Sequence, residues 1–363
     1  MAGVTAHRAE HNREDGRSPE AAPVPARRAG GFEGYDAART SAAVHDRGPR
    51  GLIAIAGTDA VSFLHGILTN DIQRLEPGEA CYAAYLTPQG RMLADMDVLQ
   101  RGADLLLDVE PGLREDLAGR LDQSLFTEDV RIADRSGDLG SLALYGPRAA
   151  ALLESVFGPG AEPGGFAAPA IGGHVSGFFD GAEVLVLGTD RGGVDGFHLF
   201  TAAALEPMAA MLAERGAARL GPDAAESLRI EGGIPRYGTD MTGDTIPLEA
   251  GIERRAISVT KGCYVGQEVI VRILHRGQGR VARRLVGLRA PDGAAPVPGA
   301  RLEHEGRDAG WVTSSIVSPR LGAIALGYVH RDLVEPGTVL TPAGSDGGTV
   351  SVASLPFDAH DTA

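Results

Sequence analysis

The sequence contains very little cysteine. Cys81 and Cys263 are the only two in 363 residues. A disulfide framework needs several closely spaced cysteines, so a disulfide-stabilised scaffold is excluded. Iron–sulfur clusters usually take four thiolate ligands. One copy of the chain therefore cannot hold such a cluster alone, and any cluster would be shared with a partner or held transiently.

Long apolar runs are also missing. No stretch reaches the ~18–20 apolar residues of a membrane-spanning helix. The N-terminal residues have no apolar signal core and include acidic residues that transit peptides avoid. The net charge of −14 argues against wholesale binding to nucleic acid or to membrane surfaces. We therefore expect a soluble, cytoplasmic protein with no membrane partner and no direct nucleic-acid partner.

Motifs of several large enzyme classes are absent. The chain has no P-loop, no HExxH, no GxGxxG after a strand and no GxSxG. Its histidines are scattered without metal-ligand spacing, so the sequence predicts no metal site. The function has to be sought in other segments.

The apolar pattern predicts a mixed α and β organisation in two or three domains. Residues 1–31 show no periodic apolar positions and are expected to form a disordered tail. From residue 142 to 215, the order strand, helix, two strands and helix indicates a split βαβ unit. After residue 284, short strands divided by Gly and Pro predict a small β-barrel or sandwich.

One segment, KGCYVGQE at residues 261–268, places a cysteine just ahead of a predicted helix at 265–275. Free N–H groups at a helix N-terminus and the charge of Lys261 would both favour the thiolate of Cys263, which is the reactive form. A small buried residue in a tight turn explains the same pattern equally well.

Two further segments carry residues suited to ligand binding. The loop at 233–249 is dense in Gly, Pro and Asp, and it can place Tyr237 and Asp240 against a ligand. In the strand at 91–99, alternation puts Asp95 and Asp97 on one face, opposite an apolar face. A turn-rich connection and a solvated sheet face are the alternative interpretations.

The segment from Arg254 to Arg284 is strongly basic. It holds eight Lys or Arg residues and one acid, Glu268, so its net charge is +7 within a chain of −14. Such a run can be one exposed helix face, or it can attract an anionic group such as a polyglutamate tail, an RNA or an acidic partner.

Several motifs together resemble one superfamily over about residues 45–355. IAGTDA at 55–60, LRIEGG at 228–233 and YGTD at 237–240 resemble both the glycine-cleavage T-protein (aminomethyltransferase) and the YgfZ proteins. The block KGCYVGQE is similar to the YgfZ branch. The chain is accordingly identified as a YgfZ-type member of the GcvT superfamily.

The resemblance implies an α+β fold of three domains closed into a ring around a folate cleft. Two α+β domains with split βαβ-like units would be followed by the C-terminal β-barrel. The implied division is a tail at 1–31, a discontinuous folate-binding domain at 32–140 plus 224–284, a second α+β domain at 141–223, and the barrel at 285–357.

The resemblance also implies tetrahydrofolate, or a related reduced folate, as the ligand. A pterin presents an amino group beside a ring N–H, which a carboxylate accepts as a pair. Asp95 is the preferred acceptor and Glu231 the other. Tyr237 would line the ring, with Asp240 in the same loop. Basic residues would hold the folate glutamates, and Lys261 and Arg272 are the candidates.

The chain departs from the transferase pattern at three positions in two stretches. The transferase's folate-site Tyr and Glu correspond to Arg191 and His198 here, and an acidic pair becomes Ala94-Asp95. We therefore expect an accessory factor, not a conventional enzyme, that binds tetrahydrofolate and uses Cys263 to assemble or repair iron–sulfur proteins. Iron–sulfur client proteins or assembly factors would be its partners. The alternatives are a folate-dependent aminomethyltransferase and a module that docks its basic segment on an anionic partner.

Overall fold

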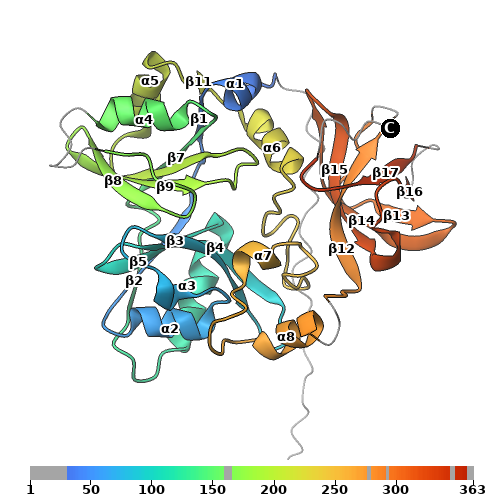
Figure 1. Cartoon of the computed structure of the whole chain (residues 1–363), viewed down its shortest axis with the longest axis horizontal. Helices are drawn as coiled ribbons and strands as arrows, with labels where there is room; N and C mark the ends of the chain where they lie inside the picture. The colour runs from blue at the N-terminus through green and yellow to red at the C-terminus, as the bar shows by residue number, and fades with distance from the viewer. Residues whose placement is uncertain (1–30, 159–165, 276–278, 292–293, 344–347, 358–363) are drawn as a thin grey trace, which may run out of the picture.

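The computed structural model describes residues 31–158, 166–275, 279–291, 294–343 and 348–357. The tail predicted at 1–31 lies outside these ranges except for its last residue. Two α+β units and a closed barrel surround a connecting segment that contains α6 and α7 (Figure 1). The predicted α+β fold of the T-protein type, with a C-terminal barrel, is confirmed.

The first unit is a five-stranded sheet in the order β3-β4-β5-β2-β6, covered on one face by helices. Its strands are β2 (Gly51–Ala56), β3 (Ala80–Leu86), β4 (Met92–Gln100), β5 (Asp104–Val109) and β6 (Arg131–Asp134), and its helices are α2 (Ala60–Ile67), α3 (Arg114–Gln123) and the short turns η1 (Ile72–Arg74) and η2 (Pro111–Leu113). Alternation in β4 puts Ala94, Met96 and Val98 into the core beneath α2 and α3, as predicted.

The second unit is a six-stranded sheet in the order β11-β1-β7-β10-β9-β8. Its elements are α1 (Tyr35–Thr40), β1 (Ala43–Asp46), β7 (Gly140–Tyr145), α4 (Ala149–Phe157), β8 (His174–Phe179), β9 (Ala182–Thr189), β10 (Gly196–Thr201), α5 (Leu205–Glu214) and β11 (Ala218–Arg219). β1 lies in the range predicted for the first domain but pairs with β7. The domain division remains a prediction.

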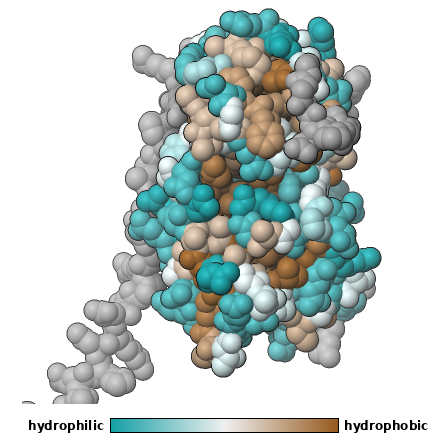
Figure 2. Space-filling view, turned by 90° about the vertical axis from the view of Figure 1, so that its left-hand side faces the viewer, coloured by the Kyte–Doolittle hydropathy of each residue, from teal (hydrophilic) through white to brown (hydrophobic). Residues whose placement is uncertain are grey.

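The two sheets pack against each other through the faces that their helices leave open. Leucines of the first sheet contact Leu185, Leu187 and Phe200 of the second sheet. Each sheet is therefore buried on both faces, which explains the nearly continuous apolar runs of β2, β5 and β9. On the face shown in Figure 2, hydrophilic residues are interspersed with hydrophobic ones, which are visible at the waist between the two units and in smaller patches on each unit.

A connecting segment leads from the second unit to the barrel. It contains α6 (Pro222–Glu231), α7 (Glu253–Ala256) and α8 (Gln267–His275). The barrel is closed in the order β12-β15-β14-β13-β16-β17. Its elements are β12 (Arg283–Ala290), β13 (Arg301–His304), β14 (Arg307–Ser318), β15 (Gly322–His330), η3 (Arg331–Leu333), β16 (Val339–Pro342) and β17 (Val350–Ala353). Among the described residues, no helix is long and apolar enough to span a membrane.

Candidate functional site

The layer between the two sheets changes from apolar to charged toward one end. Three strands carry this change, because residues two apart on a strand share one face. On each strand an apolar residue has a polar neighbour on the same face: Leu99 and Asp97 on β4, Leu106 and Asp108 on β5, and Phe200 and His198 on β10. All three polar side chains are buried. Because buried charges have to be paired, the partners of these groups define the site.

Asp108 is held by two arginines from the chain between β1 and β2. Arg47 donates through Nη2 at 2.8 Å to one carboxylate oxygen, and Arg50 donates through Nε at 2.8 Å to the other. Burial alone would raise the pKa of Asp108, but the two guanidinium charges keep it well below its usual range. Asp108 is therefore a permanent anion that fixes the two arginines.

His198 is buried beside this pair. Its Nε2 lies 3.2 Å from the hydroxyl of Tyr145, and its Nδ1 has no partner among the described residues. Burial first, and then the charge of Arg47, hold the pKa of His198 well below its ordinary value, so the imidazole is neutral.

Asp97, Asp108 and His198 bring ligand-type atoms within 4.8 Å of one another. Both oxygens of Asp108 already accept from arginines. A third guanidinium, that of Arg191, has its Nε 3.8 Å from Asp97. Three fixed positive charges around the group oppose a divalent cation, so the cluster fits a hydrogen-bonding network better than a metal site.

Arg191 connects the second sheet to Asp95 of the first. Its Nη2 donates at 3.0 Å to Asp95 Oδ2, which also accepts from the hydroxyl of Tyr82 at 2.7 Å. The guanidinium lies over the Tyr82 ring, with Cζ 3.9 Å from the ring centroid. Asp95 is only 3% exposed. Burial, its largest influence, raises the pKa of the neighbouring Asp97 above the usual value.

Two glycines fix the loop that carries Arg191. A side chain at Gly192 would lie 2.4 Å from the ring of Tyr145. Gly193 has a φ of +82°, and a Cβ there would lie 1.8 Å from the carbonyl oxygen of Leu228 in α6. Only glycine allows such close backbone packing and this left-handed conformation. The position of the Arg191 backbone is therefore set by both the second sheet and α6.

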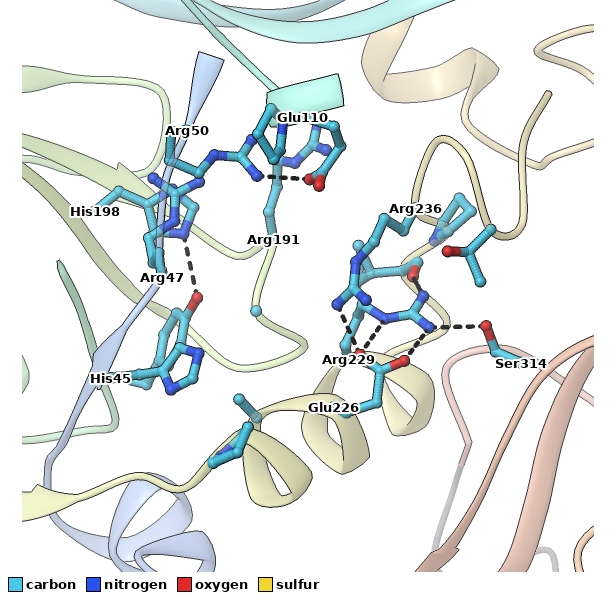
Figure 3. Close-up of a pocket in the computed structure, with 18 of the residues that line it drawn as sticks. His45, Arg47, Arg50, Glu110, Arg191, His198, Glu226, Arg229, Arg236 and Ser314 are labelled. Atoms are coloured by element: carbon cyan, nitrogen blue, oxygen red, sulfur yellow. Dashed lines mark hydrogen bonds and ion pairs between the residues drawn. The ribbon is translucent and has the colours of Figure 1, made fainter. Parts of the chain in front are cut away.

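A cavity of about 480 Å³ opens between all three units. Arg47, Arg50 and His198 line one wall, and Arg229, Arg236 and Ser314 line the opposite wall (Figure 3). Every arginine that lines it contacts a carboxylate; the carboxylates are those of Asp95, Asp97, Asp108, Glu110, Glu226 and Asp240. The cavity is thus charged but balanced, unlike a site built for a free anion.

The wall formed by α6 depends on Asp240, which is 2% exposed. It accepts from Arg229 Nη1 and from Ser314 Oγ, each at 2.7 Å, and from the backbone N–H of Arg236 at 3.0 Å. These bonds tie the loop at 233–249 to the helix and to the barrel. The sequence indicated Asp240 as a ligand-binding residue, and the structure gives it four internal partners, the fourth being the hydroxyl of Thr313.

Tyr237 lies close to Asp95. Burial first, and then the negative charge of Asp95, raise the pKa of Tyr237 to about 12. Its hydroxyl donates to the carbonyl of Met92 at 3.3 Å. The structure therefore brings together Asp95 and Tyr237, two of the predicted folate-binding residues.

Glu231 lies apart from Asp95, beside a second cavity of about 440 Å³. Its carboxylate accepts from Tyr35 at 2.7 Å and from Ser318 at 2.6 Å, and it pairs with Arg39 at 3.4 Å. These contacts join α1, α6 and the barrel. Glu231 and Asp95 therefore do not form one acceptor pair.

Lys261, Cys263 and Arg272 are not among the residues that line either cavity. The ammonium of Lys261 is buried and donates to the carbonyls of His65, Leu68 and Asn70. Its charge is therefore held by backbone carbonyls inside the fold. Cys263 is exposed, and α8 begins only at Gln267. Arg272 is exposed on α8.

Sequence patterns missed Arg47, Arg50 and Asp108, and they gave His198 only as a departure from the transferase pattern. Two of them leave a detectable signal. Asp108 and His198 are polar residues at buried positions of largely apolar strands. A lone buried polar residue needs a specific partner, so such positions mark a site even without a motif.

The chain matches two family models that together cover most of its length. Residues 29–261 match the GCVT N-terminal domain, and residues 283–357 match the glycine cleavage T-protein C-terminal barrel domain. The boundary between the two matches falls just before β12, where the barrel begins.

Several similar proteins carry the name aminomethyltransferase. One from Rubrobacter xylanophilus is 33% identical over 84% of this chain and 81% of its own length. One from Bacillus subtilis is 29% identical over 84% of both chains. The crystal structure of glycine cleavage system aminomethyltransferase T from Bartonella henselae superposes with a TM-score of 0.78 at 26% identity, covering 90% of this chain and 88% of that one.

These similarities contradict the expected iron–sulfur accessory function. The relatives and the similar solved structure are aminomethyltransferases, which favours the alternative function derived from the sequence. The structure weakens part of the reasoning behind the first expectation, because backbone carbonyls bind the ammonium of Lys261 and α8 begins four residues after Cys263. The likeness to the YgfZ branch has no support beyond the one sequence block.

Proposed function

The chain belongs to the glycine cleavage T-protein family, and from this premise we propose that it is a folate-dependent aminomethyltransferase. It would transfer the carbon of an aminomethyl group from a lipoyl-protein thioether to tetrahydrofolate. The products are methylene-tetrahydrofolate, ammonia and the free thiol. The two hydrogens that leave the folate nitrogens end on the ammonia and on the thiol, so the reaction is balanced.

The buried carboxylate of Asp95, which does not line the cavity itself but is bonded to the cavity-lining Arg191, is the observation that carries this proposal. Its Oδ2 accepts two hydrogen bonds, and its Oδ1 accepts none among the described residues. A buried oxygen without a donor is costly unless a ligand supplies one. The amino group and adjacent ring N–H of a pterin supply two parallel donors to such a carboxylate.

Aromatic rings flank this carboxylate, as a flat heterocycle requires. The Tyr82 ring is bonded to Asp95 through its hydroxyl and offers its face to a planar cation. Tyr237 comes from the connecting segment and donates to the carbonyl of Met92 on β4, the strand that carries Asp95. Both rings pack against the apolar cluster formed by β3, β4 and that segment. A pterin held between them would be desolvated on its faces and bonded at its edge.

Asp97 suits a role in proton transfer. Its side chain lines the cavity, two residues along the same strand face from Asp95. Burial raises its pKa above the ordinary aspartate value, which makes it a better proton acceptor than an exposed carboxylate. We assign Asp97 to accept the proton that leaves the folate nitrogen. The neutral imidazole of His198 lies within reach to relay it.

Turnover with a lipoyl-protein aminomethyl donor and tetrahydrofolate tests the proposal. We expect methylene-tetrahydrofolate to form with the wild-type protein. Asp95→Asn should raise KM for the folate, and Asp97→Asn should lower kcat with a smaller effect on KM. Arg39→Ala is a matched control, because Arg39 lines the other cavity. Absence of turnover in the folded wild-type protein, with an intact donor, would refute the proposed function.

A further inference from the structure

The contacts of Arg191 follow the pattern that the proposed function assigns to the pterin. The guanidinium is flat, lies with its carbon 3.9 Å from the centroid of the Tyr82 ring, and donates to Asp95. A pterin edge also presents N–H donors on a planar system, so both groups need the same aromatic face and the same carboxylate.

The hydrogen bonding between Arg191 and Asp95 is incomplete. Arg191 donates only through Nη2, while its buried Nη1 has no acceptor among the described residues. Asp95 likewise keeps Oδ1 without a donor within the described ranges. A guanidinium seated in parallel on the carboxylate would satisfy both groups. The pair therefore leaves one donor and one acceptor for another molecule to use.

From these contacts we infer that Arg191 competes with the pterin for Asp95 and thereby sets the affinity of the cavity for folate. The inference rests on the proposed function. The side chain of Arg191 is 19% exposed and lines the cavity, whereas Asp95 is 3% exposed behind it. A pterin reaches Asp95 only after the guanidinium has moved away.

The structure provides a second anionic partner for the displaced guanidinium of Arg191. Its Nε lies 3.8 Å from Asp97, so the charge keeps an anionic neighbour when the bond to Asp95 breaks. The loop backbone is fixed at Gly192 and Gly193, so the displacement is confined to the side chain. Folate binding would then exchange one charge-assisted hydrogen bond of Asp95 for the pair that the pterin supplies.

Calorimetry with tetrahydrofolate under anaerobic, reducing conditions tests the inference on the full chain. The variants are Arg191→Ala and Arg191→Gln; the second keeps an amide N–H donor on a shorter, uncharged side chain if the first fails to fold. Arg255→Ala is the matched control, because its guanidinium lies 5.9 Å from the same Tyr82 ring and pairs with Asp190. The double variant R191A/D95N removes the carboxylate for which the two groups compete.

We expect Arg191→Ala to bind tetrahydrofolate about ten- to a hundredfold tighter than wild type, the range of one charge-assisted hydrogen bond. Arg191→Gln should show a smaller gain, Arg255→Ala none, and the double variant should lose the gain. Equal or weaker binding by both Arg191 variants, with measurable wild-type binding, would overturn the inference and leave the proposed function standing. No binding by any folded variant would overturn both.

Discussion

Replacing Asp240 by alanine should destabilise the protein strongly, because this carboxylate joins three parts of the chain. Asp240 is 2% exposed and accepts from Arg229, Ser314 and the backbone of Arg236. Removing one partner of a buried ion pair costs about 3–5 kcal/mol. Arg229 keeps a second carboxylate, Glu226 at 2.7 Å. We therefore expect the lower end of that range, about 3 kcal/mol.

Asp244 in the same loop is the matched control. Its side chain is 86% exposed and pairs with Arg91 at 3.1 Å. An exposed ion pair of this kind contributes at most about 1 kcal/mol, so Asp244→Ala should leave the free energy of unfolding nearly unchanged. The two variants remove the same side chain from one loop and differ in burial and partners.

Urea denaturation followed by tryptophan fluorescence measures the difference. The chain has a single tryptophan, Trp311, and its ring lies 5.2 Å from that of Tyr328 in the barrel. The probe therefore reports on the unit to which Asp240 is attached. If Asp240→Ala and Asp244→Ala shift the unfolding free energy by the same small amount, Asp240 does not hold the units together and the reasoning is wrong.

Three further predictions concern stability. Burial alone would raise the pKa of Glu226, but two guanidinium groups lower it from 4.5 to about 2, so the stabilising contribution of Glu226 is present above pH 4.5 and is lost as the pH falls toward 2. Glu226→Gln should therefore be about 3 kcal/mol less stable than wild type at pH 7 and equal to it near pH 2. A difference in unfolding free energy that does not change with pH would contradict this. Lys261→Met should lower the free energy of unfolding by about 1–3 kcal/mol, because three carbonyls lose their donor, whereas Cys263→Ser should change it by no more than about 0.5 kcal/mol. Equal effects of the two substitutions in thermal unfolding would count against the internal role of the lysine. Gly193→Ala should destabilise by at least about 1 kcal/mol, because its φ is +82° and the new Cβ would meet Leu228; an unchanged melting temperature would show that the loop adapts.

Local patterns in the sequence predict most of the fold. The apolar face of β4 and the short Gly- and Pro-bounded strands of the barrel follow from periodicity alone. The strands β1, β11 and β16 were not predicted; all three are short. Such short strands are stabilised by pairing with distant neighbours, and β1 pairs with β7 about a hundred residues later.

The candidate site is harder to predict because its partners are far apart in the chain. Asp95 was identified from strand alternation, but its partner Arg191 lies 96 residues later in the sequence. Glu231 was the second candidate by residue type, and only the fold shows that its carboxylate accepts from Tyr35 and Ser318. The roles of Cys263 and Arg272 remain predictions.

The most direct test of the account follows the transferred carbon itself. Wild-type protein would be mixed with tetrahydrofolate and a lipoyl-protein donor whose aminomethyl carbon is isotopically labelled, and the folate products would be separated and counted. The account predicts that the label appears in methylene-tetrahydrofolate, with one ammonia released for each carbon transferred. Label that stays on the donor protein, while the chain is folded and tetrahydrofolate is bound, would contradict it.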